Sequence, residues 1–412
     1  MPSHRPRAAA SATLAWLALV ACGNVATGPI HEPRVRTMLP PLSTGTLAVL
    51  GVTVVPMSGP DPRPGQTVVV RDGIIVAIGP ASEVEVPPDA ERIDGTGRWL
   101  MPGLVDMHVH LRRTDLSAYR QAGITTLRSM WGTSEVATLR NELLAGAAHP
   151  TIFSAGPGMD GDRPVHPGTV VLTDRAAARQ AVRSQAADGW DFIKVYNTLD
   201  PAVYAAILDE GHRAGIAVVG HVPFAVSIDG AVELGQASVE HLTGIAESVA
   251  DGRAPAGWLS FNLLAGTRVS HLLAGRRVWV CPTLTVLEIL AGNTLPPASA
   301  AQAVSHQGAM VKALHDAGVP LLAGTDGGYG RVPAGSSLAR ELELMVQAGL
   351  TPYEALRTAT VNAATFLGLD GQVGTVSVGE RADLVLLSAN PLADIRAVRT
   401  PVGLVQRGSR IY

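Results

Sequence analysis

The chain has 412 residues, of which 47% are hydrophobic and only 16% are charged, so we expect a folded globular protein and not a disordered one. Its 32 basic and 35 acidic residues leave a net charge of −3. No long basic run follows the first few residues, which argues against nucleic-acid binding. A low aromatic content of 4%, beside many Ala, Gly, Val and Leu, is typical of parallel strands packed against helices.

Residues 1–22 have the pattern of a bacterial export signal that ends in a lipid-modified cysteine. Arg5 and Arg7 precede an apolar run, Ala8 to Ala21, that is too short to span a bilayer comfortably. The run ends in "LVAC", which resembles the lipobox, and we expect acyl chains on Cys22 to anchor a cell-envelope lipoprotein to the membrane. The alternative is an ordinary signal cleaved nearby, which would release a soluble periplasmic or secreted protein. The Pro-rich residues 23–44 are a plausible tether between lipid and fold.

Two β-rich segments, residues 45–102 and 366–412, flank the middle of the chain. The run "GQTVVVRDGIIVAIGP" places Asp72 and Gly73 between two apolar stretches, which is a hairpin signal. "GERADLVLLS" and "PVGLVQRGSRIY" add short apolar strands and a turn near the C-terminus. We expect the two ends to pair into one small composite β-sandwich domain.

Between residues 103 and 365, short apolar runs with Gly or Pro at their edges alternate with stretches of helical period. The predicted strands are "GLVDMHVHL", "GITTLRSM", "TIFSAG", "DFIKVY", "GIAVVGHV", "ASVEHL", "VWVCPTL" and "PLLAGTD". Helical segments, such as residues 174–189 and 201–215, lie between several of them. The pattern predicts an α/β fold, a (β/α)8 TIM barrel, whose chemistry sits at the C-terminal ends of the strands.

Polar side chains stand at those strand ends. His108 and His110 are two apart on a strand, so they share one face. The other members each follow or interrupt an apolar run, and they are Lys194, His221, His241 and Asp326. Convergent imidazoles and a carboxylate are ligands for zinc or a similar ion. Taken singly, each has a plainer interpretation, such as a hydrogen-bonded core histidine or an Asp that caps a helix.

"PGLVDMHVHL", the lysine of "IKVY", "EHL" and "GTD" together resemble the metal-dependent amidohydrolase superfamily, as do "ATVNAATFLGL" and "GTVSVGERADLVLL" near the C-terminus. The similarity is greatest to its lysine-bridged branch, which includes Xaa-Pro dipeptidases and N-acyl amino acid hydrolases. The resemblance implies that His108, His110 and Asp326 bind one divalent metal, His221 and His241 a second, and Lys194 both. The donor types make zinc the favoured ion.

A lysine can bridge two cations only after its neutral amine has reacted with CO2 to give an N-carboxylate. A buried site beside cations favours that neutral amine, so we expect Lys194 to be carboxylated. A hydroxide that bridges the metals would attack the substrate carbonyl, with Asp326 as the general base and later the acid. The expected reaction is hydrolysis of an amide bond in a small molecule, such as a dipeptide or an N-acyl amino acid. A snorkelling Lys194 on an edge strand is the alternative.

Three further residues are candidates for substrate binding. Tyr196 shares the strand face of Lys194, and His166 lies in the Gly- and Pro-rich loop "GPGMDGDRPVHPGT". Arg128 follows the second predicted strand, in a segment similar to the family's "TTVRD" passage, with Ser129 in place of the acid. Many members of the branch have a tyrosine and an arginine shortly after the fifth-strand histidine, which bind a substrate carboxylate. The chain has "HVPFAVSID" there, so a free α-carboxylate on the substrate is not implied.

Two other functions stay open at the level of sequence. One is a mononuclear cyclic amidohydrolase or deaminase resembling imidazolonepropionase, whose relatives generally lack the bridging lysine. The other is a non-catalytic, lipid-anchored binding protein, which the complete ligand set disfavours. The sequence leaves the substrate, the metal and the oligomeric state undetermined.

Overall fold

The computed structural model describes residues 39–250, 253 and 255–412. The chain separates into two units, Met1–Ile30 and His31–Tyr412, and every described residue belongs to the second. The predicted signal, the lipobox cysteine Cys22 and most of the predicted tether lie outside the described residues. Among the residues described, none of the helices combines the length and the apolar character needed to cross a membrane.

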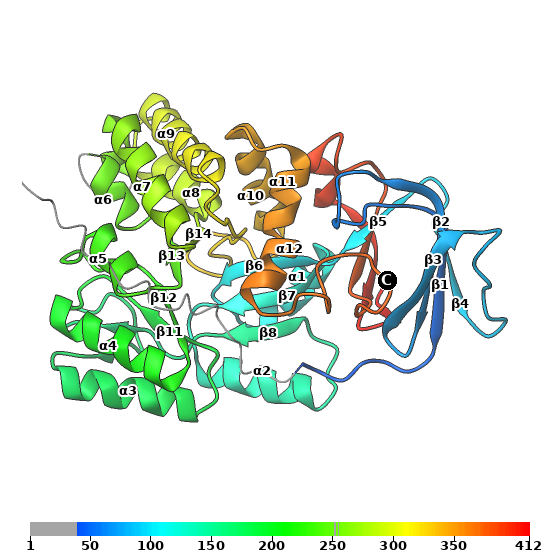
Figure 1. Cartoon of the computed structure of the whole chain (residues 1–412), viewed down its shortest axis with the longest axis horizontal. Coiled ribbons are helices and arrows are strands. Elements are labelled where there is room, and N and C mark those ends of the chain that lie inside the picture. The colour runs from blue at the N-terminus through cyan, green and yellow to red at the C-terminus, as the bar shows by residue number, and fades with distance from the viewer. Residues whose placement is uncertain (1–38, 251–252, 254) are drawn as a thin grey trace, which may run out of the picture. The chain divides into compact units, whose positions relative to one another are not determined.

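Strands from both ends of the chain share one mixed sheet (Figure 1). Its path is β17-β16-β15-β5-β1-β2-β3, with β4 paired to β1. The strands are β1 (Thr46–Val54), β2 (Arg63–Arg71), β3 (Ile74–Pro80), β4 (Glu91–Asp94), β5 (Trp99–Pro102), β15 (Leu384–Leu387), β16 (Pro401–Gln406) and β17 (Ser409–Arg410). Asp72 and Gly73 have φ values of 48° and 78°, as a two-residue hairpin turn requires, so the predicted hairpin is confirmed.

The middle of the chain contains parallel strands. They are β6 (Leu104–Val109), β7 (Ile124–Ser129), β8 (Thr151–Ser154), β9 (Met159–Asp160), β10 (Val170–Val171), β11 (Phe192–Val195), β12 (Ala217–Gly220), β13 (Ser238–Glu240) and β14 (Trp279–Cys281). One sheet has the order β6-β7-β8, and the other has the order β10-β9-β11-β12-β13-β14. A bridge between Ala155 and Phe192 joins the two sheets. The class is therefore α/β, as the alternating pattern predicts.

The eighth predicted strand, "PLLAGTD", differs from the expectation. Residues 320–327 run between β14 and β6 but make only isolated bridges, from Leu321 to Val280 and from Gly327 to Val109. The regular ladder is interrupted because the N–H of Ala323 donates to the carbonyl of Thr358 instead of to a neighbouring strand. The short strands β9 and β10 lie in the loop that carries His166 and were not predicted.

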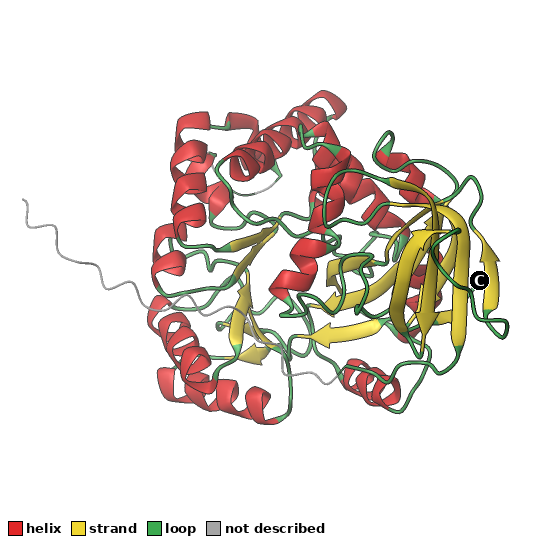
Figure 2. Ribbon diagram, turned by 45° about the vertical axis from the view of Figure 1, so that its right-hand side comes forward, coloured by secondary structure: helices red, strands yellow, loops and turns green. Residues whose placement is uncertain are grey.

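Helices lie on the outer side of the parallel strands (Figure 2). They are α1 (Leu116–Gln121), α2 (Ser134–Leu144), α3 (Arg175–Ala187), α4 (Pro201–Ala214), α5 (Ile228–Glu233), α6 (Ile245–Val249), α7 (Leu263–Gly275), α8 (Leu284–Thr294), α9 (Pro297–Asp316), α10 (Ser336–Gln347), α11 (Pro352–Thr358) and α12 (Val361–Phe366). Short 3-10 turns span Arg113–Asp115, Ala256–Ser260 and Ile395–Arg399. Capping residues in the sequence mark where two of the α-helices begin. The Asp174 carboxylate caps the N-terminus of α3, and Asp200, which precedes Pro201, caps the N-terminus of α4.

The mixed sheet and the parallel strands share part of one apolar core. Val55 and Met57 from the N-terminal segment and Val385 from β15 are fully buried in the same cluster as Leu127 of β7. Burial of apolar surface is the main favourable term in folding, so this common core ties the chain ends to the strands that carry the polar residues.

We expect Gly123→Ala to destabilise the protein more than Gly146→Ala does. Both glycines have positive φ, 74° and 99°, so both substitutions carry the same left-handed backbone penalty of roughly 1–2 kcal/mol. A Cβ at Gly123 would also lie 2.8 Å from Cγ2 of Val385, whereas a Cβ at Gly146 would meet no atom within 4 Å. The overpacking should add about 1–3 kcal/mol to the loss of unfolding free energy, measured by urea denaturation. Equal losses in the two variants would contradict the contact with β15.

Candidate metal centre and active site

His108, His110 and Asp326 form a cluster at the end of β6. Their ligand atoms lie within 4.8 Å of one another. Asp326 Oδ1 is 3.3 Å from Nε2 of His108 and 2.9 Å from Nε2 of His110. The backbone also joins the two segments, since the N–H of Asp326 donates to the carbonyl of His108. Residues 218 positions apart in sequence thus meet as the sequence predicts.

The positions of the protons on His108 indicate that the cluster is suited to bind a cation. Nδ1 of His108 lies 2.8 Å from the carboxylate of Glu240, which accepts and does not donate, so Nδ1 carries a proton. In a neutral imidazole, Nε2 then presents a lone pair toward Asp326. Both His108 Nε2 and Asp326 Oδ1 are buried without a hydrogen-bond partner in the part of the chain that is described. Two buried acceptors that face each other are best satisfied by a metal ion between them.

His221 and His241 stand beside this cluster and are oriented in the same way. The ring centroid of His241 is 4.5 Å from that of His108 and 4.8 Å from that of His221. Nδ1 of His221 donates to the side-chain carbonyl of Asn197 at 2.7 Å. Nδ1 of His241 is 2.7 Å from Thr283 Oγ1, whose own proton goes to the carbonyl of Pro282. Each Nδ1 is engaged, which leaves Nε2 of each ring for a cation.

Lys194 lies on β11 among these groups and is 1% exposed. Burial lowers the pKa of its ammonium group to about 8, against the opposing effect of Glu240 and Asp326. The neutral amine, which is the form that reacts with CO2, is therefore more accessible than in an ordinary lysine. Gly220 on the neighbouring strand makes room for the stem, since a Cβ there would lie 2.9 Å from Cδ of Lys194.

Strained backbone accompanies the ligands. His241 and Asp326 have φ values of 58° and 65°, and Thr283 has 50°. Such left-handed conformations are uncommon for residues other than glycine and cost roughly 1–3 kcal/mol each. They end the strands abruptly, and they persist because burial and hydrogen bonds at these positions over-determine the conformation.

Glu240 and Arg128 form a fully buried ion pair next to the cluster. NH2 of Arg128 lies 2.9 Å from Oε1 of Glu240, and both side chains are 0% exposed. The guanidinium also donates to the carbonyl of Met107 and to Oγ of Ser238. Burial alone would raise the pKa of Glu240, but Arg128 and His108 hold that pKa below its ordinary value. The carboxylate therefore stays charged and accepts the Nδ1 proton of His108.

The expectation that Arg128 binds substrate does not fit this position. The side chain of Arg128 has no exposed surface, and each of its three nitrogens donates to Met107, Ser238 or Glu240, so it does not face a ligand. Its charge is used inside the protein, to neutralise Glu240. The family-like "TTLRS" segment thus supplies a positioning residue.

Sequence reasoning missed the groups that orient the ligands. Glu240 directly precedes His241 in "EHL", and a charged residue on an otherwise apolar strand was the available signal. Glu341 of α10 is a second case. Its carboxylate accepts from the N–H groups of Leu284 and Thr285 at the start of α8, the helix that follows Thr283. Burial raises the pKa of Glu341 to about 7. Nothing local in the sequence links it to His241.

Tyr196 and His166 are brought together as a pair. The Tyr196 hydroxyl is 2.8 Å from Nε2 of His166, and the Tyr196 ring is 4.0 Å from the ring of His221. Burial, followed by the neighbouring His110, lowers the pKa of His166. Both side chains are half-buried, so they lie where a bound molecule could reach them.

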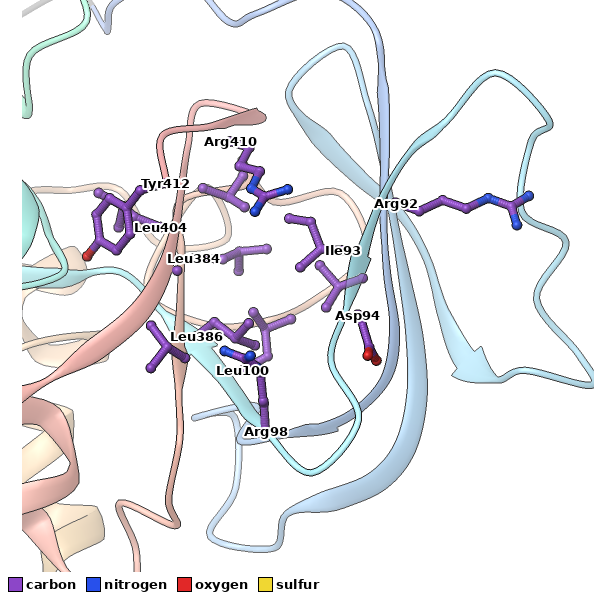
Figure 3. A pocket seen from close by; sticks show the side chains of 14 residues that line it. Arg92, Ile93, Asp94, Arg98, Leu100, Leu384, Leu386, Leu404, Arg410 and Tyr412 are labelled. Atoms are coloured by element: carbon purple, nitrogen blue, oxygen red, sulfur yellow. The ribbon is translucent and has the colours of Figure 1, made fainter.

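A cleft of about 230 Å³ lies elsewhere, in the mixed sheet (Figure 3). Leucines from β5, β15 and β16 line it, together with Arg98, Arg410 and Tyr412, and Arg92 points away from it. None of the predicted metal ligands lines this cleft. The imidazole cluster at the strand ends is therefore the better candidate for the active site.

Comparison with known proteins agrees with this geometry. The model of the amidohydrolase family matches residues 99–408, which include the parallel strands and most of the C-terminal strands. The chain belongs to the amidohydrolase family. It is therefore a hydrolytic enzyme that acts on carbon–nitrogen bonds, and the non-catalytic alternative is set aside. The family generally uses divalent metals, which agrees with the cluster at the strand ends.

Individual amidohydrolases are similar over most of their length. Imidazolonepropionase of Symbiobacterium thermophilum is 26% identical over 390 residues, which cover 79% of this chain and 84% of that enzyme. Ochratoxinase of Aspergillus niger is 27% identical over 428 residues, which cover 85% of this chain and 84% of the ochratoxinase. A solved structure assigned as a prolidase from Bifidobacterium longum has a TM-score of 0.75 and 27% identity, covering 90% of this chain and 95% of that one.

We expect Glu240→Gln to weaken metal binding by this amidohydrolase about 10- to 100-fold, the usual effect of losing a carboxylate that orients a ligating histidine. The amide loses the charge that holds His108 Nδ1–H and leaves Arg128 buried without its partner. Affinity would be measured by competition with a chelating dye. Glu343→Gln is the matched control, because it removes a buried carboxylate of α10 that pairs with Arg340 and Arg399.

Loss of fold must be separated from loss of metal affinity in that experiment. Breaking a buried pair costs about 3–5 kcal/mol, so the double variant Arg128→Met/Glu240→Gln, which removes both charges, should unfold at a higher temperature than Glu240→Gln. It should still bind metal weakly. Metal affinity equal to that of Glu343→Gln would show that Glu240 does not orient His108.

Proposed function

We propose that this amidohydrolase holds two divalent metal ions, with zinc as the favoured ion, and hydrolyses the amide bond of dipeptides or N-acyl amino acids. The observation that carries the proposal is the position of Lys194. It is the buried lysine among five other ligand candidates, and its charge acts on His110, His221 and His241 alike. The chain contains one other lysine, Lys312, which lies on the surface helix α9 and pairs with Asp316.

The chemistry of the donors supports an assignment of each residue. His108, His110 and Asp326 would hold one ion, His221 and His241 the other, and carboxylated Lys194 would bridge them. Imidazole and carboxylate donors in this number suit zinc. The hydrogen-bond partners of the Nδ1 atoms of His108, His221 and His241 leave the Nε2 atoms of these rings available, which is the condition that ligation requires.

Divalent ions bound here would polarise the substrate carbonyl and lower the pKa of water, which makes water a nucleophile at neutral pH. Asp326 would accept the proton of that water at a carboxylate oxygen and deliver it to the departing nitrogen. Burial would raise the pKa of Asp326, but the neighbouring imidazoles, His108 and His110 among them, hold that pKa well below its ordinary value, so Asp326 starts as an acceptor. Tyr196 and His166, which are hydrogen-bonded to each other, would contact the substrate from the half-buried side of the site.

A mononuclear reaction like that of imidazolonepropionase is the second candidate, because the sequence similarity to that enzyme is of the same order as to the ochratoxinase. A buried lysine with no metal to bridge would be an unexplained cost in that mechanism. The number of ions per chain separates the two candidates.

We expect wild-type protein to contain two metal ions per chain and Lys194→Ala to contain fewer, as measured by plasma emission spectroscopy. Amide hydrolysis should fall by about 10²-fold or more, because a shift of about 1 Å in reacting groups has effects of this size. Short carboxylic acids such as acetate and propionate should restore part of the activity by replacing the lost carboxylate. Lys312→Ala is the matched control and should retain both metal and activity.

Two results would contradict the binuclear mechanism. One is full activity of Lys194→Ala without added carboxylic acid. The other is a single ion per chain in fully active wild-type protein, which would favour the mononuclear candidate.

We propose the complete architecture in the same terms: a (β/α)8 barrel over residues 103–365 and a composite β-sandwich from residues 45–102 and 366–412. The bridges between Ala155 and Phe192, Leu321 and Val280, and Gly327 and Val109 support a continuous ring of parallel strands. The pairing of β15 with β5 supports a domain built from both ends.

We propose further that Cys22 carries the lipid anchor, with residues 23–44 as the tether. The wild-type chain, expressed with its N-terminus in a bacterium that processes lipoproteins, should partition into the detergent phase of Triton X-114. Cys22→Ser should move to the aqueous phase, and Cys281→Ser, which alters the buried cysteine, should not. Aqueous partitioning of the wild type would favour the soluble export signal.

A further inference from the structure

The candidate metal centre is open on one side. Of the proposed ligands, His108, Lys194, His221 and Asp326 are buried, whereas His110 and His241 keep part of their surface. The side chain of His110 is 22% exposed, against 0% for His108. Solvent therefore reaches the centre from the side of His110 and His241, and we take this side as the approach for a substrate.

Four aromatic rings lie along this approach. They come from four separate connections: Trp131 follows β7, His166 lies between β9 and β10, Tyr196 follows β11 and Tyr329 follows Asp326. Ring centroids of Trp131 and Tyr329 are 6.4 and 5.3 Å from that of His110. His166 contacts all three other rings, at 5.2 Å from Trp131, 5.0 Å from Tyr196 and 5.4 Å from Tyr329. We call these four side chains the aromatic enclosure.

The enclosure is held in place by contacts that do not involve a ligand. Trp131 packs against Gly158, where a Cβ would collide with the indole ring. The Tyr196 hydroxyl bonds His166, and the carbonyl of His166 accepts from Thr169 at 2.6 Å. The N–H of Tyr329 donates to the carbonyl of Asp326 at 3.0 Å. Rings that are positioned in advance lose little entropy when a ligand binds.

The chemistry of the enclosure selects a flat apolar group. His166 meets the other three rings edge to face, at interplanar angles of 72–85°. Such packing extends naturally to a further aromatic ring, which gains attraction beyond its buried area. The enclosure contains no carboxylate, ammonium or guanidinium group, because its members are one tryptophan, two tyrosines and one histidine. They offer an aromatic ring a better environment than they offer a carboxylate or an ammonium group.

We propose that the aromatic enclosure makes this enzyme specific for amides that carry an aromatic group beside the scissile bond. The proposal rests on the proposed amide hydrolysis and specifies its substrate class. It assigns Trp131 and Tyr329 to substrate binding, in addition to Tyr196 and His166.

Two matched pairs of compounds test the proposal on zinc-loaded full-length protein. N-acetyl-L-phenylalanine is compared with N-acetyl-L-cyclohexylalanine, and N-benzoylglycine with N-cyclohexanecarbonylglycine, so that each pair differs in aromaticity and hardly in size. N-acetyl-L-alanine serves as the small reference. In at least one pair we expect kcat/KM to be about 2- to 10-fold higher for the phenyl compound. The preferred phenyl compound should exceed the alanine compound by about 10- to 100-fold.

Tyr329→Leu removes the most exposed ring of the enclosure and keeps an apolar side chain. It should reduce the phenyl-to-cyclohexyl ratio to about one half or less, and Tyr329→Phe should restore the wild-type ratio. Tyr412→Leu is the matched control, because Tyr412 in the mixed sheet is 38% exposed and Tyr329 is 40% exposed. The control should leave the ratio unchanged.

The outcomes separate the two proposals. Hydrolysis with equal kcat/KM for phenyl and cyclohexyl compounds in both pairs would overturn the aromatic specificity and leave the amide hydrolysis intact. Hydrolysis of none of the compounds would overturn the proposed function for this class. In that case the same compounds are titrated as ligands by calorimetry, where tighter binding of the phenyl member, lost in Tyr329→Leu, supports the enclosure and equal binding rejects it.

Discussion

The buried pair of Arg128 and Glu240 is the interaction on which the candidate centre depends. Neither charge has access to water, and an unpaired charge in such a place would cost several kcal/mol, on the order of 3–5. Arg128 belongs to β7 and Glu240 to β13, and the guanidinium also bonds the carbonyl of Met107 on β6. Satisfying one pair therefore brings together strands that lie more than a hundred residues apart in the chain.

The same pair has a consequence for chemistry. Because Arg128 keeps Glu240 ionised, the carboxylate accepts the Nδ1 proton of His108 and fixes the tautomer of that ring. Asn197 and Thr283 act in the same way on His221 and His241. In each of these three imidazoles the Nδ1 proton is held by an acceptor, so the lone pair on Nε2 faces the centre of the site. The acceptors are the carboxylate of Glu240, the amide oxygen of Asn197 and the hydroxyl of Thr283.

Most of the ligand candidates could be predicted because their signal is local. A single polar residue at the end of an apolar run is visible in the sequence, and period-2 alternation places His108 and His110 on one face. The prediction of a strand at residues 320–326 was less successful. The N–H of Ala323 donates to the carbonyl of Thr358, and no regular strand forms there. Arg128 was predicted to bind substrate because the segment around it resembles a family passage. In the structure it is buried and pairs with Glu240, a partner that the local sequence does not reveal.

The sequence by itself determined the α/β class and the family, and it predicted candidate metal ligands, because apolar periodicity and polar residues at strand ends depend on near neighbours in the chain. Only the tertiary structure decided how those residues are used. The partners of Arg128, His241 and Trp131 are Glu240, Thr283 and Gly158, and each partner lies in a different segment of the chain from the residue it contacts. Hydrogen bonding and ring packing act over a few ångströms in space, and no spacing along the sequence encodes which distant segments come that close.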